Sequence, residues 1–171
     1  MEGIIASLRA KGISVKFDDR DTHKPGWKFA EYELKGVPLR VAIGQRDLEN
    51  GTVELARRDT LSKETIAQED LVGTIEQRLE EIQEQLFTRA RDYRDEHITE
   101  VDTFDQFKEV IASKGGFVSA HWDGTSETED KIKDLTKATI RCIPLNSKEE
   151  AGQCVFSGAK STRRVLFAKA Y

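Results

Sequence analysis

Two side chains one helical turn apart have the chemistry to recognise a nucleic-acid base. In the run "KFAEYELKG", Phe29 and Glu33 stand at positions i and i+4, so a helix would place the ring and the carboxylate on one side. A planar ring can stack on a base, and a carboxylate can accept hydrogen bonds from base amino and imino groups. Arg40 follows in the run "PLR", and Arg46 and Asp47 come soon after it. The alternative is a solvated helix with Phe29 as an ordinary core contact, and the pattern alone favours that alternative.

The run "FDDRD" holds three carboxylates around Arg20, directly after a predicted strand. Carboxylates are ligands for Mg²⁺, so a hydrolase or metal enzyme is one interpretation, although it needs further ligands from elsewhere in the chain. The alternative is a loop whose carboxylates pair with Arg20 and cap the next segment, a common role of Asp in turns. We favour the loop.

Other chemistry-bearing residues give no enzyme signature. The histidines, His23, His97 and His121, lie far apart in the sequence and are predicted to be surface or structural residues. The chain contains no glycine-rich phosphate loop, nucleophile elbow or HExxH zinc motif. Cys142 and Cys154 lie in apolar, strand-like runs without a CxxC pair or a disulfide framework, which predicts buried thiols in a reducing cytoplasm.

The composition predicts a folded, acidic chain of one or two domains. Its 171 residues are 37% hydrophobic and 34% charged, and the net charge at pH 7 is -4. Non-specific nucleic-acid binding relies on a basic surface that releases counterions, so any RNA binding here should be weak and depend on selected bases. No apolar run has the length of a transmembrane helix and the N-terminal run lacks the layout of a signal peptide, so no membrane association is expected.

Apolar spacing in the first 72 residues predicts alternating helices and strands. A helix near the N-terminus is followed by the strand-like run "ISVKF", in which apolar and polar residues alternate. The run "PGWKFAEYELKG" predicts a second helix, and "LRVAI" predicts a second strand. Asn50-Gly51 predicts a tight turn into an antiparallel partner. Residues 1–72 are therefore predicted to form an α/β domain with a mixed sheet.

The remaining residues predict a long helix and a second small domain. From Leu71 to Tyr93 apolar residues recur at steps of three and four, which is typical of an amphipathic helix about 35 Å long. A connecting helix within residues 73–100 is the main interpretation, and a coiled-coil dimerisation helix is the alternative. A capping box at Thr103 and Gln106 predicts the start of a further helix. Strand-like runs follow it, so residues 101–171 are predicted to be a small α+β domain.

The run "PGWKFAEYELKGVPLRVAIG", together with the closing "FAKAY", resembles the prolyl-tRNA synthetases of the eukaryote/archaeal-like type, a class II aminoacyl-tRNA synthetase family. The resemblance covers essentially the whole chain, as an anticodon-binding domain followed by a C-terminal extension. It implies anticodon recognition within a cytoplasmic, homodimeric enzyme that joins proline to its tRNA with ATP and Mg²⁺. Nothing in the chain resembles the catalytic domain, so we expect an inactive fragment whose anticodon-binding domain lacks its first strand. A freestanding RNA-binding or protein-interaction module is the alternative.

The resemblance also implies roles for individual residues. Phe29 corresponds to an aromatic residue that lies against an anticodon-loop base, and Glu33 and Arg40 correspond to residues that contact anticodon guanines. Arg46 and Asp47 correspond to a pair that does the same. Guanine offers N1 and N2 donors to carboxylates and O6 and N7 acceptors to arginines, which suits these residue types.

In the C-terminal extension, the resemblance implies a docking element and a degenerate metal site. Tyr171 corresponds to a terminal residue whose carboxylate reaches toward the parent enzyme's active site, so the catalytic domain is an expected partner. Many family members hold zinc with four cysteines, two on each side of the strand "TIRC". Here Cys154 matches one ligand, Ser157 stands at another, and the run "HWDGTSETED" contains no cysteine. We therefore predict no catalytic residue and no bound metal in this chain.

Overall fold

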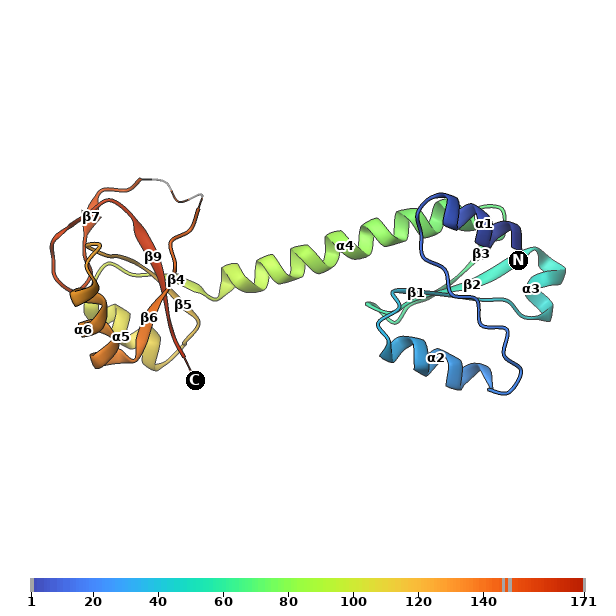
Figure 1. Cartoon of the computed structure of the whole chain (residues 1–171), viewed down its shortest axis with the longest axis horizontal. Coiled ribbons are helices and arrows are strands. Elements are labelled where there is room, and N and C mark those ends of the chain that lie inside the picture. The colour runs from blue at the N-terminus through green and yellow to red at the C-terminus, as the bar shows by residue number, and fades with distance from the viewer. Residues whose placement is uncertain (1, 146, 148, 171) are drawn as a thin grey trace. The chain divides into compact units, whose positions relative to one another are not determined.

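The structure is a computed structural model that describes residues 2–145, 147 and 149–170. The chain forms two compact units, Met1–Thr88 and Arg89–Tyr171. Helix α4, Leu71–Glu96, belongs to both units as one continuous helix (Figure 1). Among the described residues, no helix combines the length and the hydrophobicity that crossing a membrane needs. Tyr171, the predicted docking element, lies outside the described residues.

The first unit places a three-stranded sheet between helices. The elements before α4 are α1 (Glu2–Ala10), α2 (Pro25–Leu34), β1 (Leu39–Ala42), α3 (Gln45–Asn50), β2 (Thr52–Arg57) and β3 (Lys63–Ala67). The strands pair antiparallel in the order β1-β2-β3. α1 and the start of α4 cover one face of this sheet, and α2 covers the other (Figure 1).

The alternation of side chains along β1 and β2 separates an apolar face from a polar face. Val53 and Leu55 are fully buried and pack against α1 and α4. Glu54 between them and Ala56 after Leu55 point toward α2, because successive strand residues face opposite sides of a sheet. The antiparallel register places Arg40 of β1 opposite Ala56 of β2 on that second face.

Residues 13–20 belong to no helix, and no strand ladder within the described residues includes them. Ile13 and Val15 pack against the buried core, as the alternation predicts, whereas Phe17 keeps 48% of its surface exposed. The prediction of a strand here is wrong, because alternation indicates which side chains turn inward, whereas a ladder also needs a neighbouring backbone.

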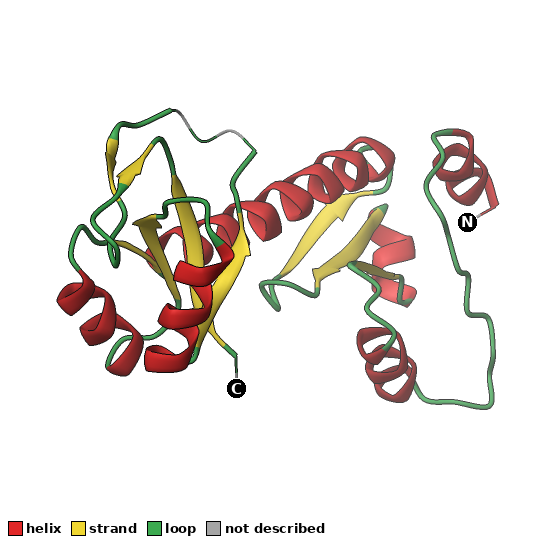
Figure 2. Ribbon diagram, turned by 60° about the vertical axis from the view of Figure 1, so that its left-hand side comes forward, coloured by secondary structure: helices red, strands yellow, loops and turns green. Residues whose placement is uncertain are grey.

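The second unit contains a mixed sheet. After α4 the chain forms β4 (Ile98–Glu100), α5 (Phe104–Ala112), β5 (Phe117–His121), α6 (Ser126–Thr136), β6 (Ala138–Cys142), β7 (Gly152–Gln153), β8 (Lys160–Ser161) and β9 (Arg164–Lys169). The larger sheet, whose strands are among those drawn in yellow in Figure 2, has the order β4-β5-β9-β6. β4 and β5 are parallel, and β9 is antiparallel to both β5 and β6. The predicted fold class is confirmed, with the parallel pair in the second unit rather than the first.

Aromatic rings fill the core of the second unit. Phe107 of α5 and Phe167 of β9 are fully buried and meet edge to face, with their ring centroids 5.1 Å apart. The predicted capping box at the start of α5 is confirmed. Oγ1 of Thr103 accepts from the amide of Gln106, and Oε1 of Gln106 accepts from the amide of Thr103, both at 3.3 Å. The box sets where α5 begins and hence which of its residues face the sheet.

The two cysteines differ in exposure. Cys154 is buried, as predicted, whereas Cys142 is exposed. The prediction is wrong at Cys142 because the pairing of β6 with β9 shifts between Ile140 and Cys142. An irregularity of this kind lets the next side chain turn to the other face of the strand.

Candidate nucleic-acid interface

α2 presents one side to the polar face of the first sheet. Pro25 occupies the first turn, where its fixed φ suits a helix start, and Gly36 follows the helix with φ 79°. Phe29 and Glu33 lie one turn apart, as predicted, and line a small pocket together with Arg40 of β1. The structure therefore brings these three predicted site residues together.

The guanidinium of Arg40 lies over the ring of Phe29, with Cζ 3.6 Å from the ring centroid. Nη1 of Arg40 is 3.5 Å from Oε1 of Glu54, and only 15% of the Arg40 side chain is exposed. A cation above an aromatic face is stabilised by the quadrupole of the ring. A base that approaches this face of Phe29 meets the guanidinium plane first, and bases stack on arginine planes as they do on rings.

Arg58, which no motif in the sequence indicates, joins the end of β2 to α2. Its Nε donates to the main-chain oxygen of Glu33 at 2.8 Å, and its amide donates to that of Pro38 at 3.0 Å. Arg58 lines the same pocket as Phe29, Glu33 and Arg40. Within the part of the chain that the structure describes, the carboxylate of Glu33 has no hydrogen-bond partner, so a ligand can reach it.

The direction of the Arg58 side chain follows from the sheet. Arg57 turns to α4, where its Nη1 is 3.0 Å from Oε2 of Glu81, and Arg58 turns to α2. Ala56 lies opposite Arg40. Arg58 comes two positions after Ala56, so alternation directs both side chains to the same face of the sheet. The position of Arg58 beside Arg40 therefore depends on the register of β1 against β2, which the sequence alone does not determine.

The sheet face beneath α2 carries an excess of positive charge. Arg40 and Lys63 lie on either side of Ala56 in cross-strand register. Both pair with Glu54, at 3.5 Å and 3.2 Å. Arg58 adds a further cation beside them. A chain that is acidic in total thus places three cations and one carboxylate on this sheet face.

Arg46 and Asp47 lie on α3 and do not line this pocket. Oδ2 of Asp47 accepts from the amide of Gly44 at 2.8 Å, and its Oδ1 accepts from the hydroxyl of Thr52 at 3.3 Å. The bond from Gly44 caps the start of α3, and the bond from Thr52 ties Asp47 to the start of β2. Arg46 is exposed and makes no hydrogen bond or ion pair with the described residues. A role for this pair in base recognition stays a prediction.

Asp18 and Arg20 of "FDDRD" form a charged network with α2. Nη2 of Arg20 donates to Oδ2 of Asp18 and to Oε2 of Glu31, both at 2.7 Å. The hydrogen bonds from Arg20 hold the pKa of Asp18 well below its ordinary value, against the opposing effect of burial. Tyr32 donates to Asp18 at 3.2 Å, which ties the loop to α2. No group of three or more His, Cys, Asp or Glu side chains among the described residues is arranged to hold a metal ion.

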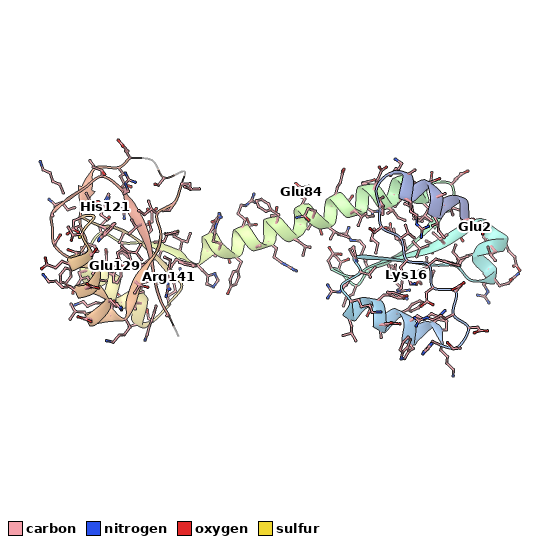
Figure 3. The ribbon with its side chains drawn as sticks, viewed as in Figure 1. Glu2, Lys16, Glu84, His121, Glu129 and Arg141 are labelled. Carbon is pink, nitrogen blue, oxygen red and sulfur yellow. The ribbon has the colours of Figure 1, made fainter. Side chains whose placement is uncertain are left out.

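The three histidines occupy separate places. His23 stacks on Trp27 and His97 stacks on Tyr93, with ring centroids 3.9 Å and 4.1 Å apart. His121, labelled in Figure 3, is buried in the second unit, and its Nδ1 lies 3.1 Å from a serine hydroxyl. Local packing accounts for each ring, and none lines the pocket.

In the second unit, a hydrogen-bonded carboxylate lies where the resemblance places zinc ligands. Oδ2 of Asp123 accepts from the hydroxyls of Ser157 at 2.6 Å and Thr128 at 2.7 Å. Its Oδ1 accepts from the amide and the hydroxyl of Thr125, at 3.0 Å and 2.8 Å. Burial raises the pKa of Asp123, but these hydrogen bonds outweigh burial and hold the pKa well below its ordinary value. With only Cys154 as a thiol beside Ser157, these residues do not fit zinc, which prefers four thiolate or imidazole ligands.

Comparisons with known proteins agree with this geometry. Residues 1–78 match the family model of the anticodon binding domain, so the first unit belongs to the class of tRNA anticodon-binding domains. Residues 104–171 match the family model of the prolyl-tRNA synthetase C-terminal domain. Taken together, the two matches and their order in the chain show that it belongs to the prolyl-tRNA synthetase family.

Relatives and a solved structure extend the match to nearly the whole chain. The proline–tRNA ligases of Christiangramia forsetii and Flavobacterium johnsoniae are each 65% identical to it over 98% of its residues, which cover 34% of each relative. The crystal structure of prolyl-tRNA synthetase from Cryptosporidium parvum, complexed with L-proline and AMP, matches with a TM-score of 0.89 and 33% identity. That match covers 99% of this chain and 36% of the other. The chain thus spans about a third of the length of its curated relatives.

Proposed function

We propose that the first unit binds the anticodon loop of the proline-specific tRNA within a proline–tRNA ligase. The ligase joins proline to this tRNA with ATP and Mg²⁺, and the proposed protein partners of this chain are the catalytic domain and a second copy of the enzyme. The chain itself selects the tRNA and catalyses no reaction. The observation that carries the proposal is the meeting of Phe29, Glu33 and Arg40 at one pocket on a positively charged sheet face.

The chemistry of the pocket suits an anticodon guanine. The carboxylate of Glu33 can accept from N1–H and from the N2 amino group of guanine, and adenine has neither donor. Arg40 and Phe29 offer a planar stack on which the base can lie. We assign Arg46 and Asp47 to a neighbouring guanine, a contact for which Asp47 gives up its hydrogen bonds from Gly44 and Thr52.

The chain should bind proline-specific tRNA more tightly than the same tRNA whose anticodon guanines are replaced by adenines, at one fixed low salt concentration. Glu33→Ala should reduce this preference about tenfold, because a good base contact contributes about 1–3 kcal/mol of discrimination. Fluorescence anisotropy with labelled tRNA measures both effects. Glu69→Ala, a change at an exposed glutamate outside the pocket, is the matched control and should leave the preference intact. Equal binding of the two tRNAs by the unaltered chain contradicts the proposal.

The turn around Asp123 closes without zinc in this proposal, because hydroxyl and amide donors already occupy its carboxylate. X-ray fluorescence of the purified chain should show zinc far below a stoichiometric amount. A chelator should leave the thermal unfolding midpoint of the second unit unchanged. Stoichiometric zinc that survives dialysis, with a midpoint that falls on chelation, would show that the turn is a metal site.

A further inference from the structure

We infer that Arg58 and Glu33 together read the Watson–Crick edge of one anticodon guanine, an assignment that rests on the proposed function and adds a specificity residue to it. The two residues come from different elements, the end of β2 and the last turn of α2, and line one pocket. The inference follows from how Arg58 is anchored and from the order of donors and acceptors that the pair presents.

Arg58 is held by contacts that use only part of its hydrogen-bonding capacity. Its amide donates to the oxygen of Pro38 at 3.0 Å, which fixes the backbone after β2. Its Nε donates to the main-chain oxygen of Glu33 at 2.8 Å, which fixes the plane of the guanidinium beside that residue. A guanidinium has five N–H donors, so the terminal nitrogens keep donors for a ligand. Because Arg58 is exposed, a base can reach them.

The pair reproduces the pattern that guanine meets in a base pair. The Watson–Crick edge of guanine presents O6 as an acceptor, then N1–H and the N2 amino group as donors. In the base pair, the facing edge of cytosine presents one donor followed by two acceptors. A terminal N–H of Arg58 followed by the two carboxylate oxygens of Glu33 gives the same order. Adenine presents an amino donor and an acceptor nitrogen instead, so both of its groups would face groups of the same kind.

Arg40 and Arg58 have different roles in this proposal. Arg40 lies flat on Phe29 and pairs with Glu54, so it serves as a stacking surface for the base. Arg58 then supplies the contact to O6. In this arrangement no protein donor contacts N7 of the guanine. In duplex DNA, by contrast, a single arginine often donates to both O6 and N7.

The test uses proline-specific tRNA in which one anticodon guanosine at a time is replaced by adenosine, inosine or 7-deazaguanosine. The unaltered chain should bind 7-deazaguanosine tRNA as well as guanosine tRNA, because only N7 is changed. It should bind inosine tRNA more weakly, because inosine lacks the N2 amino group. At the same position, Arg58→Ala should reduce the preference for guanosine over adenosine about tenfold. Arg58→Lys, which keeps the charge but loses the planar donor set, should lose most of the preference as well.

Arg9→Ala is the matched control, because Arg9 also donates to a main-chain oxygen but lies on α1, at the opposite face of the first sheet. Unchanged thermal unfolding of the Arg58 variants shows that they are folded. An Arg58→Ala variant that weakens binding of guanosine and adenosine tRNA equally, with the salt dependence reduced by about one phosphate contact, assigns Arg58 to the backbone and overturns the inference.

Two further outcomes also overturn it and are distinguishable from each other. If the unaltered chain prefers guanosine and Arg58→Ala keeps that preference at every position, the assignment of Arg58 fails while the proposed function stands. The same holds if 7-deazaguanosine weakens binding at the position where the preference depends on Arg58. If the unaltered chain shows no preference at any anticodon guanosine, the proposed function and this inference fail together.

Discussion

Replacing Phe107 with alanine is expected to lower the free energy of unfolding of the second unit by about 3–5 kcal/mol. The ring is fully buried, meets Phe167 edge to face at 5.1 Å and stacks on Phe104 at 5.8 Å. β5 and β9 each pair with neighbours on both sides, so we expect the sheet to relax only partly around the cavity. The cost therefore includes both the lost transfer energy and an unfilled void.

Denaturant unfolding followed by tryptophan fluorescence measures this loss. The chain has one tryptophan in each unit, so a Trp27→Phe background leaves Trp122 as the reporter of the second unit. Leu135→Ala is the control, since that side chain is 63% exposed and its truncation should cost less than about 0.5 kcal/mol. Comparable losses from Phe107→Ala and Leu135→Ala would show that the ring does not organise this core.

Asp123→Asn should destabilise the second unit by about 1–3 kcal/mol, because a carboxylate that accepts hydrogen bonds contributes more than a neutral amide. Both oxygens of Asp123 accept, and the amide nitrogen of asparagine would turn a donor toward the donors of either Thr125 or Ser157 and Thr128. Urea unfolding of the second unit near neutral pH measures the change.

The same residue predicts a dependence of stability on pH. In the folded chain the pKa of Asp123 lies below its ordinary value of 3.8, so the folded state binds this proton less readily than the unfolded state. The stabilisation is therefore complete above the ordinary pKa and is lost as the pH falls below it. In Asp123→Asn this contribution should be absent. Asp105→Asn is the control, since Asp105 is 92% exposed and its pair with Lys108 is screened by solvent. An unaltered acid dependence in Asp123→Asn would assign the effect to other carboxylates.

Much of the candidate site could be predicted because its rules are local. The i, i+4 spacing within "FAEYE" places Phe29 and Glu33 on one side of α2, and strand alternation turns Arg40 away from the core and toward them. Arg58 escapes such reasoning because its place depends on the pairing of two strands across a long connection. For Asp47 the sequence is compatible with two roles. A carboxylate three residues after Gly44 can cap a helix or contact a base, and in the structure it caps α3.

The same distinction holds for the fold. The helices and the capping box at Thr103 follow from periodicity and local donors, and the structure contains them. The run from Ile13 to Phe17 has the alternation of a strand but no ladder in the described residues, and Cys142 lies past a shift in register. The missing ladder and the exposure of Cys142 both depend on which backbone segment lies beside the strand. A short stretch of sequence does not specify that neighbour.

α4 has a consequence for where the chain opens first. Its buried residues, Leu71, Ile75 and Ile82, all lie in the first half of the helix, and none of residues 83–96, all of which the structure describes, is buried. Tertiary packing supplies most of the stability of protein helices, so this later half depends on its own backbone hydrogen bonds and side-chain pairs. Its amide protons should exchange with solvent deuterium through local openings, at rates set by helix–coil equilibria, long before those of the strands that hold either core. The helix thus joins two cooperatively folded bodies through a segment that can unwind without unfolding them.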